Sequence, residues 1–218
     1  MPGMTIRILA LAVPLLLLCA GTGCRSTYYS AMEKVGIYKR DLLKKRVVAA
    51  RDDQKEASQQ FKSAMTRMKE LYGFQGGNLE KVYDALKRDY DRSVSKSEDV
   101  HKRIRDVETV SQDLFKEWEE EIQQISTENL RANSRNQLQE TRSRYNEMHL
   151  ALKRAEKSME PVLTALRDHV LYLKHNLNAQ AIASLKGEAA SIQSDIAKLI
   201  ADMNAAIARA DEFIKQMQ

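Results

Sequence analysis

The chain has 218 residues, of which 30% are charged and 6% are aromatic, and it contains only 3 prolines and 8 glycines. This composition is typical of long amphipathic helices and argues against a β-sheet protein. Its 35 basic and 30 acidic residues give a net charge of +5, a mixed surface that excludes a nucleic-acid-binding footprint.

The N-terminus has the pattern of a bacterial export signal. A positive charge, a short apolar run over residues 8–20 and several small residues precede Cys24. About 13 apolar residues are too few for a membrane-spanning helix, which needs about 20. We therefore expect a signal peptide over residues 1–23, a lipid on Cys24 and a linker over 24–29. Because Gly21 stands where the lipoprotein pattern usually has leucine, a free thiol at Cys24 is the alternative.

The residue after Cys24 predicts the membrane to which the chain goes. Arg25 occupies this position, whereas aspartate there retains lipoproteins in the inner membrane of many enteric bacteria. We therefore expect an outer-membrane lipoprotein that faces the periplasm of a Gram-negative cell. Cys19 would leave with the signal peptide, so the processed chain has one cysteine and cannot form an internal disulfide.

A basic stretch follows the expected anchor. It begins about 15 residues after Cys24, or roughly 20–25 Å if the chain is helical. Near an anionic membrane each such charge contributes about 1 kcal/mol, so these side chains are candidates for contact with phospholipid headgroups. The alternative is a solvated helix face that pairs with Asp41, Asp52 and Asp53. The stretch comprises Lys39, Arg40, Lys44, Lys45 and Arg46.

Three interruptions divide the rest of the chain into four segments of similar length. The clearest lies at 73–78, where adjacent glycines are poor helix formers and Asn78 is a good N-cap. A softer break lies around Ser126 and Thr127, and the third lies at 175–178, where Asn178 can cap the following helix. The first segment begins with a capping box at Ser30 and Glu33. We expect helices over about 30–72, 79–125, 129–174 and 179–216.

Apolar residues recur in alternating steps of three and four along all four segments, as at Phe61, Ala64, Met68 and Leu71. Such spacing, sustained over many turns, is a coiled-coil seam that strands cannot produce. Helices of matched length joined by short connections favour an up-down antiparallel arrangement. The sequence therefore predicts an all-α fold, an elongated up-down antiparallel four-helix bundle that forms one domain over residues 30–218.

Polar residues interrupt two of these seams. Gln54 lies within the seam of the first segment, and the middle of the second seam is thin and polar because it contains Tyr90, Ser93 and Ser97. A buried polar residue on such a seam can set the register of the helices at some cost in stability. A locally loosened and hydrated core is the alternative.

No residue pattern indicates catalysis. His101 ends a Glu-x-x-His unit of the kind that di-iron bundles use, but there is no second copy, which favours a solvated histidine. The glutamates around Trp118 point around a helix rather than toward one point, which favours a solvated face over a cation site. The sequence has neither a phosphate-binding glycine loop nor a serine nucleophile motif. We therefore expect no enzyme activity, no cofactor and no metal site.

Six short stretches are distinctive. They are YY at 28–29, AMEKVGI at 31–37, KRD at 39–41, LF-x-EWE at 114–119, MEPVL at 159–163 and YLKHNLNA at 172–179. Together they resemble an uncharacterised bacterial family, the domain-of-unknown-function family numbered 2959, and the last stretch is the most specific. The resemblance covers nearly the whole chain after the expected signal. It implies a helical, exported protein of a Gram-negative bacterium and no particular activity.

These observations favour a non-enzymatic, membrane-anchored periplasmic rod, a structural or protein-interaction lipoprotein of the cell envelope. The alternative is a lipid-binding helical bundle of the apolipoprotein type, which opens along its thin seams to cover a membrane or to carry an amphiphile. Homo-oligomerisation is left open, and no nucleic-acid partner is expected.

An up-down bundle would place the first and third connections together at the end farthest from the anchor. We expect aromatic and imidazole side chains there to bind an envelope protein. In the alternative, Leu177 only staples the last helix and Tyr172 packs beneath it. The candidates for partner binding are Phe74, Tyr172 and His175, with Tyr72 beside them.

Overall fold

The computed structural model describes residues 29, 32 and 36–217. The expected signal peptide, Cys24 and the capping box at Ser30 and Glu33 lie outside these residues. The chain divides into two units, residues 1–38 and residues 39–218. Among the described helices, none combines the length and the apolar character that crossing a bilayer requires.

The first unit contains a glycine that ends the first predicted helix early. Met32 is helical, Gly36 has a φ of +78°, and the Ile37 N–H donates to the Met32 carbonyl at 3.0 Å. This is the hydrogen bond that ends a helix at a left-handed glycine. The prediction of one continuous helix from residue 30 is therefore wrong, because the chain is interrupted at Gly36 before it becomes helical again at Lys39.

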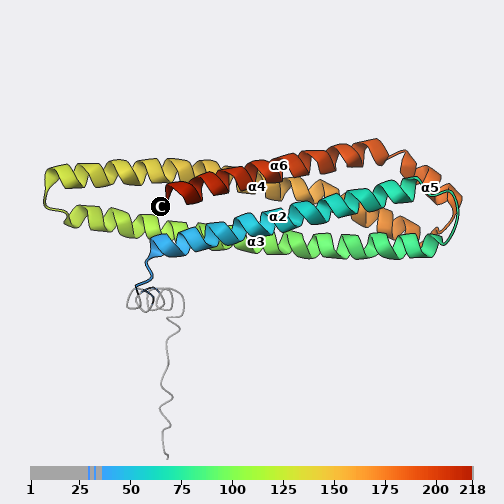
Figure 1. The fold of residues 1–218 in the computed structure, drawn as a ribbon, viewed down its shortest axis with the longest axis horizontal. Helices are drawn as coiled ribbons and strands as arrows, with labels where there is room; N and C mark the ends of the chain where they lie inside the picture. The colour runs from blue at the N-terminus through green and yellow to red at the C-terminus, as the bar shows by residue number, and fades with distance from the viewer. Residues whose placement is uncertain (1–28, 30–31, 33–35, 218) are drawn as a thin grey trace, which may run out of the picture. The chain divides into compact units, whose positions relative to one another are not determined.

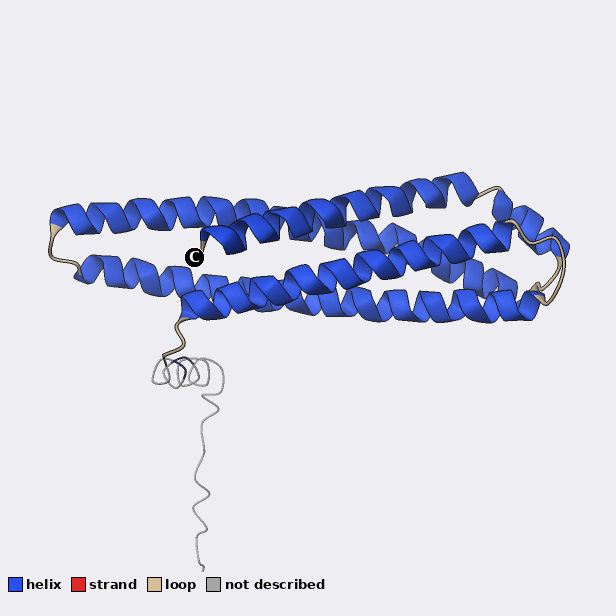
Figure 2. Ribbon diagram, in the orientation of Figure 1, coloured by secondary structure: helices blue, strands red, loops and turns tan. Residues whose placement is uncertain are grey.

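The second unit consists of five helices and contains no strand within its described residues (Figure 1 and Figure 2). The all-α prediction is confirmed, and the three predicted breaks coincide with the connections that precede α3, α4 and α5. The helices are α2 (Lys39–Tyr72), α3 (Leu79–Gln124), α4 (Glu128–His175), α5 (Ala179–Lys186) and α6 (Ala189–Gln216).

Two asparagines fix the starts of α3 and α5. The Asn78 Oδ1 accepts from the Lys81 backbone N–H at 3.0 Å, and the Asn178 Oδ1 accepts from the Ala181 backbone N–H at 2.9 Å. Each bond satisfies a backbone donor that the first turn of a helix leaves without a partner. Both helices therefore begin where the capping residues predict.

The predicted fourth helix is divided in two. The Gly187 N–H donates to the Ser184 carbonyl at 3.2 Å and the Glu188 N–H to the Leu185 carbonyl at 3.1 Å, so the chain tightens into i→i+3 bonds between α5 and α6. Glycine costs about 1 kcal/mol relative to alanine inside a helix, which favours a break here. The unit therefore has five helices rather than the four that the sequence predicts.

The long helices pack side by side. α2 packs against α3 and α6, and α4 packs against the same two helices. Consecutive long helices run in opposite directions (Figure 1). The connections before α3 and α5 therefore lie at one end of the bundle, which we call the two-loop end. The 125–127 connection lies at the other, which we call the hairpin end (Figure 1).

α3 and α4 project beyond the other helices at the hairpin end (Figure 1). They have 46 and 48 residues, whereas α2 has 34 and α6 has 28. Lys39, the first residue of α2, forms an ion pair with Glu117, so the part of α3 after Glu117 extends past α2. Within this projection the Trp118 Nε1 donates to the Ser134 Oγ at 2.9 Å, which ties the two helices together.

Most of the predicted seam residues form the core of the bundle. In α2 and α4 the apolar seam residues are buried, as Phe61 and Leu166 illustrate with no exposed surface. In α6 the predicted Ile207 and Ile214 are half-buried, and their neighbours Ala206 and Phe213 are buried instead. At the end of α3, Trp118 and Ile125 are half-buried, and so are the seam residues at its start, Leu79, Val82 and Tyr90. The core therefore thins toward the two-loop end on the α3 side.

Candidate functional site

The interface between α3 and α4 is closed in the half nearer the hairpin end. The rings of Phe115 and Tyr145 meet edge to face there, with centroids 5.4 Å apart. His101 of α3 forms an ion pair with Glu156 of α4. From this pair toward the two-loop end, the described side chains form no further hydrogen bond, ion pair or ring contact between the two helices. The closed half of the interface therefore ends at this pair.

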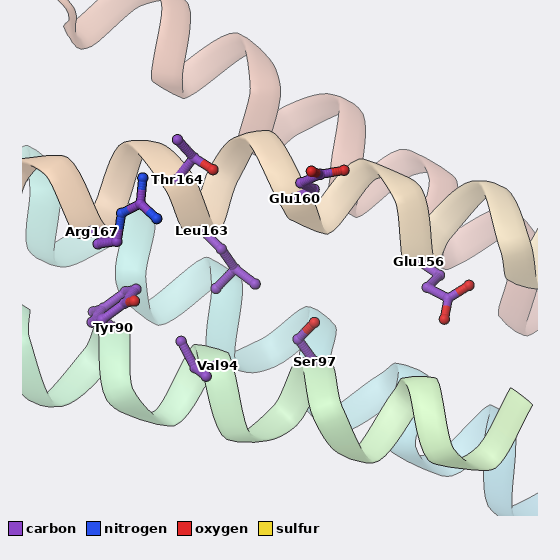
Figure 3. A pocket seen from close by; sticks show the side chains of 8 residues that line it. All are labelled: Tyr90, Val94, Ser97, Glu156, Glu160, Leu163, Thr164 and Arg167. Carbon is purple, nitrogen blue, oxygen red and sulfur yellow. The ribbon is translucent and has the colours of Figure 1, made fainter. Parts of the chain in front are cut away.

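Beyond this pair α3 and α4 leave a groove of about 340 Å³ between them (Figure 3). Val94 of α3 and Leu163 of α4 point toward one another across it, and Arg167 lies on α4 opposite Tyr90. The groove thus has an apolar floor and charged side chains along its α4 edge. Its lining residues are Tyr90, Val94 and Ser97 of α3 and Glu156, Glu160, Leu163, Thr164 and Arg167 of α4.

A second hollow of about 550 Å³ adjoins the groove, since Ser97 and Glu156 line both. Every other residue that lines it is charged or titratable, and it has no apolar floor. We therefore regard it as a polar surface depression that leads into the groove. These other residues are Glu98, Asp99, His101, Lys102 and Arg105 of α3.

The His101–Glu156 pair lies at the junction of the two hollows. His101 is exposed, and the Glu156 Oε2 is also bound by Lys153 at 2.5 Å. Burial alone would raise the pKa of Glu156, but hydrogen bonds from Lys153 and His101 outweigh it and hold the pKa below its ordinary value. Both carboxylate oxygens are therefore engaged. No group of three or more His, Cys, Asp or Glu side chains in the described part of the chain could hold a metal ion.

Gln54 and Ser58 form an unpaired polar layer inside the bundle. Gln54 is fully buried, and among the described residues neither its Oε1 nor its Nε2 has a hydrogen-bond partner. The buried Ser58 Oγ, one turn further along α2, has none there either. Each unpaired group costs about 1–3 kcal/mol. The adjacent Asp53 pairs with Arg103 at 2.7 Å, so this layer lies at the level where the α3–α4 groove begins.

Polar contacts close the α2–α3 interface at the level of the groove. The buried carboxylate of Asp89 pairs with the Arg67 Nε at 3.2 Å. The Asp89 carbonyl accepts from the Gln60 Nε2 at 3.1 Å and from the Ser93 Oγ at 2.7 Å. The seam that contains Ser93 is therefore polar but paired, and the opening is on the α4 side of α3.

A buried histidine joins α4 to α2 at the two-loop end. The His169 Nε2 lies 3.0 Å from the Tyr72 Oη, and its Nδ1 lies 3.0 Å from the Ala165 carbonyl. Because a carbonyl can only accept, Nδ1 carries the proton of the neutral ring and Tyr72 donates to Nε2. Burial lowers the pKa of His169, although the Ala165 carbonyl, Glu188 and Asp168 oppose this effect. Tyr72 is buried, so its predicted place beside the surface cluster is wrong.

The predicted partner-binding residues all lie at the two-loop end. Phe74 is half-buried, Tyr172 is 40% exposed and His175 is exposed. No ring contact joins any two of them within the described part of the chain. Leu171 and Leu177, which are 55% and 41% exposed, add apolar surface near Tyr172 and were not predicted.

The predicted membrane-surface residues divide into paired and unpaired side chains. Lys39 pairs with Glu117, and Arg46 pairs with Asp106 at 3.5 Å. Both partners belong to α3, whereas the sequence suggested aspartates of α2. The three that form no ion pair with another described residue are Arg40, Lys44 and Lys45.

The α4 side of the groove was not predicted. Three of its residues each directly follow a buried seam residue of α4 and are not part of the seam themselves, so the spacing of apolar residues does not identify them. They are Glu160, Leu163 and Arg167. One signal in the sequence could have identified them. Leu163 is a leucine that does not belong to the seam of α4, and it lies at the level of Tyr90, where the seam of α3 is thin.

The chain was also compared with known proteins. A family model described as "Protein of unknown function (DUF2959)" matches residues 28–217, which include all five helices and the groove. No curated protein and no solved structure matches the chain. A function is therefore inferred from the chain's own residues.

Proposed function

The chain belongs to this family, whose description states no activity, and we propose that it is a non-enzymatic, membrane-anchored rod of the periplasm. It acts as a structural or protein-interaction lipoprotein of the cell envelope. A lipid on Cys24 holds it to the outer membrane, on the side that faces the periplasm. In this elongated up-down bundle, α5 and α6 together take the place of a fourth long helix.

The observation that carries this proposal is the exposed apolar surface at the two-loop end. Leu171, Tyr172 and Leu177 are all exposed within seven residues of sequence, with Lys174 and His175 among them. Single exposed apolar residues are ordinary, but a group of them with a polar rim marks an interaction site. α3 separates this surface from the hairpin end by roughly 69 Å. The arrangement supports a rod that is held at one end and binds a protein at the other.

The anchor is tested by Cys24→Ser. We expect this variant to move from the membrane fraction to the soluble periplasmic fraction, as measured by cell fractionation. Cys19→Ser is the matched control, because that residue lies within the expected signal peptide, and it should leave the chain with the membranes. A Cys24→Ser chain that still pellets with membranes would show that a lipid on Cys24 is not the anchor.

The partner surface is tested by Tyr172→Ala combined with His175→Ala in the full chain. Crosslinking in the native envelope, followed by identification of the captured protein, should show loss of capture while the helical melting transition stays nearly unchanged. Leu150→Ala is the control, because Leu150 is also exposed on α4 but lies far from the two-loop end. Parallel losses of capture and of stability would show that the connection only holds the bundle together.

A lipid-binding bundle of the apolipoprotein type is the second candidate. It is favoured by Gln54 and Ser58, whose buried polar atoms have no partner among the described residues. Opening the bundle would let water satisfy these groups and recover part of their cost. Circular dichroism and Trp118 fluorescence, with and without anionic vesicles, test this function. Retained helicity with a shifted Trp118 emission would support opening on lipid, and identical spectra would reject it.

A further inference from the structure

Along α4, the wall of the groove has a negatively charged side chain, then two uncharged ones, then a positively charged one. Glu160 and Arg167 lie on either side of Leu163 and Thr164, and all four line the groove (Figure 3). The two charged residues are seven positions apart, about 10.5 Å along the helix. Both are exposed. Among the described residues, Glu160 forms no ion pair and Arg167 pairs with its neighbour Asp168 at 3.3 Å.

This order of charges is complementary to itself. When a second α4 crosses the first in the antiparallel direction, its Arg167 meets Glu160 and its Glu160 meets Arg167. The midpoint of the two charges falls between Leu163 and Thr164, so these residues of both copies lie at the twofold axis. A parallel second helix would set like charges against each other, which is unfavourable. The charges therefore select the antiparallel direction.

We propose that the groove between α3 and α4 binds the same groove of a second copy of this chain, forming an antiparallel homodimer. Twofold symmetry is the commonest arrangement of soluble oligomers, and it requires a self-complementary surface of this kind. The dimer removes Leu163 and the half-buried Val94 and Tyr90 from water, while the charge pairs fix the register. This inference does not rest on the membrane anchor.

The antiparallel direction has a consequence for the assembly. The hairpin ends of the two copies point away from each other. Such a dimer fits rods that lie along one surface, or rods that come from two surfaces facing one another.

The test is the oligomeric state of the full chain, measured by sedimentation over a concentration series. The natural chain should form a dimer as its concentration rises. Glu160→Arg alone and Arg167→Glu alone each set like charges against each other, and each should weaken dimerisation at least about tenfold. An equimolar mixture of the two single variants should restore the dimer, and so should the chain that carries both exchanges.

The control is a pair of charges on the same helix outside the groove. Glu140 and Arg144 lie on α4 nearer the hairpin end, 3.8 Å apart. Glu140→Arg and Arg144→Glu should leave the dimer unchanged. Melting curves of all variants show whether they fold. If a charge reversal unfolds the chain, Glu160→Gln with Arg167→Gln replaces it and should still weaken the dimer.

Four outcomes would overturn the proposal. The first is a natural chain that stays monomeric at every concentration, and the second is a dimer that withstands both single reversals. The third is a failure of the mixture and of the double exchange to restore the dimer. The fourth is a monomer that carries bound lipid in native mass spectrometry, because that result would assign the groove to an amphiphile.

Discussion

In the half of the α3–α4 interface near the hairpin end, the large rings of Phe115 and Tyr145 fill the space between the helices. In the half near the two-loop end, Val94 and Ser97 face Leu163 across an open groove. Both halves belong to the same two continuous helices. Apolar spacing therefore decides that the helices pair, and the volume of the side chains between them decides whether the pair closes.

The largest expected effect is in the closed half. Phe115→Ala should lower the free energy of unfolding by about 3–5 kcal/mol, because it removes a buried ring and leaves a cavity. The matched change in the open half, Tyr90→Ala, should cost about 1 kcal/mol or less, because that ring is only half-buried. Urea denaturation followed by circular dichroism measures both. Equal losses would show that the two halves are equally well packed.

The boundary between the halves should contain a stabilising substitution. Gln54→Leu replaces a buried amide that has no partner in the described structure with an apolar side chain of similar size. It should raise the free energy of unfolding by about 1–3 kcal/mol. Gln60→Leu is the control and should destabilise, because the Gln60 amide donates to the Asp89 carbonyl. A loss of stability with Gln54→Leu would indicate that water or a ligand pairs with Gln54 in solution.

The two-loop end should weaken in mild acid. Burial lowers the pKa of His169 in the folded state, so the unfolded chain binds a proton more readily. Stability from this site is complete above the unfolded pKa of about 6.5 and is lost as the pH falls from there through the folded pKa.

Melting temperatures between about pH 7.5 and pH 5 measure this dependence. The natural chain should melt at progressively lower temperature as the pH falls below about 6.5. His169→Asn should be less stable at neutral pH, since it loses the contact with Tyr72, and should show a flatter dependence. An identical slope in both chains would assign the pH dependence to other groups.

The smallest effect concerns the first turn of α2, beside the projecting hairpin. Lys39→Gln breaks the ion pair with Glu117 and should cost about 0.2–1 kcal/mol at low salt. Arg40→Gln, one residue further on, should change stability by less than that, because Arg40 forms no ion pair with a described residue. Denaturation at low and high salt measures the difference, which should shrink as salt rises. A larger effect from Arg40→Gln would contradict this assignment.

Local features of the fold could be predicted from the sequence because their causes are local. Asn78 and Asn178 cap the helices that follow them through hydrogen bonds within one turn. The breaks at Gly36 and Gly187 were missed, because a single glycine costs a helix only about 1 kcal/mol. Packing and the conformation of nearby residues decide whether such a glycine ends the helix, and neither can be read from the spacing of apolar residues.

The candidate site was predicted less well than the fold. Tyr90 and Ser97 of the predicted thin seam line the groove, whereas Ser93 is buried and paired with the Asp89 carbonyl in the α2–α3 interface. Whether Leu163 is covered depends on the distance between two helices about 70 residues apart in sequence, which no local pattern encodes. The same holds for Gln54, because its polarity is evident from the sequence, but packing decides whether another described side chain reaches its amide.

The up-down arrangement also determines how the bundle bears mechanical load. The chain enters α2 at Lys39 near the hairpin end, and the surface with Leu171 and Tyr172 lies at the opposite end (Figure 1). A pull between these points runs along the helix axes, so all the packed layers of α2 must slide past α3 and α6 together. Each atomic contact contributes little, but contacts that are loaded simultaneously resist together. A force applied across the bundle separates the layers one after another, so the rod should withstand tension along its length and yield to peeling.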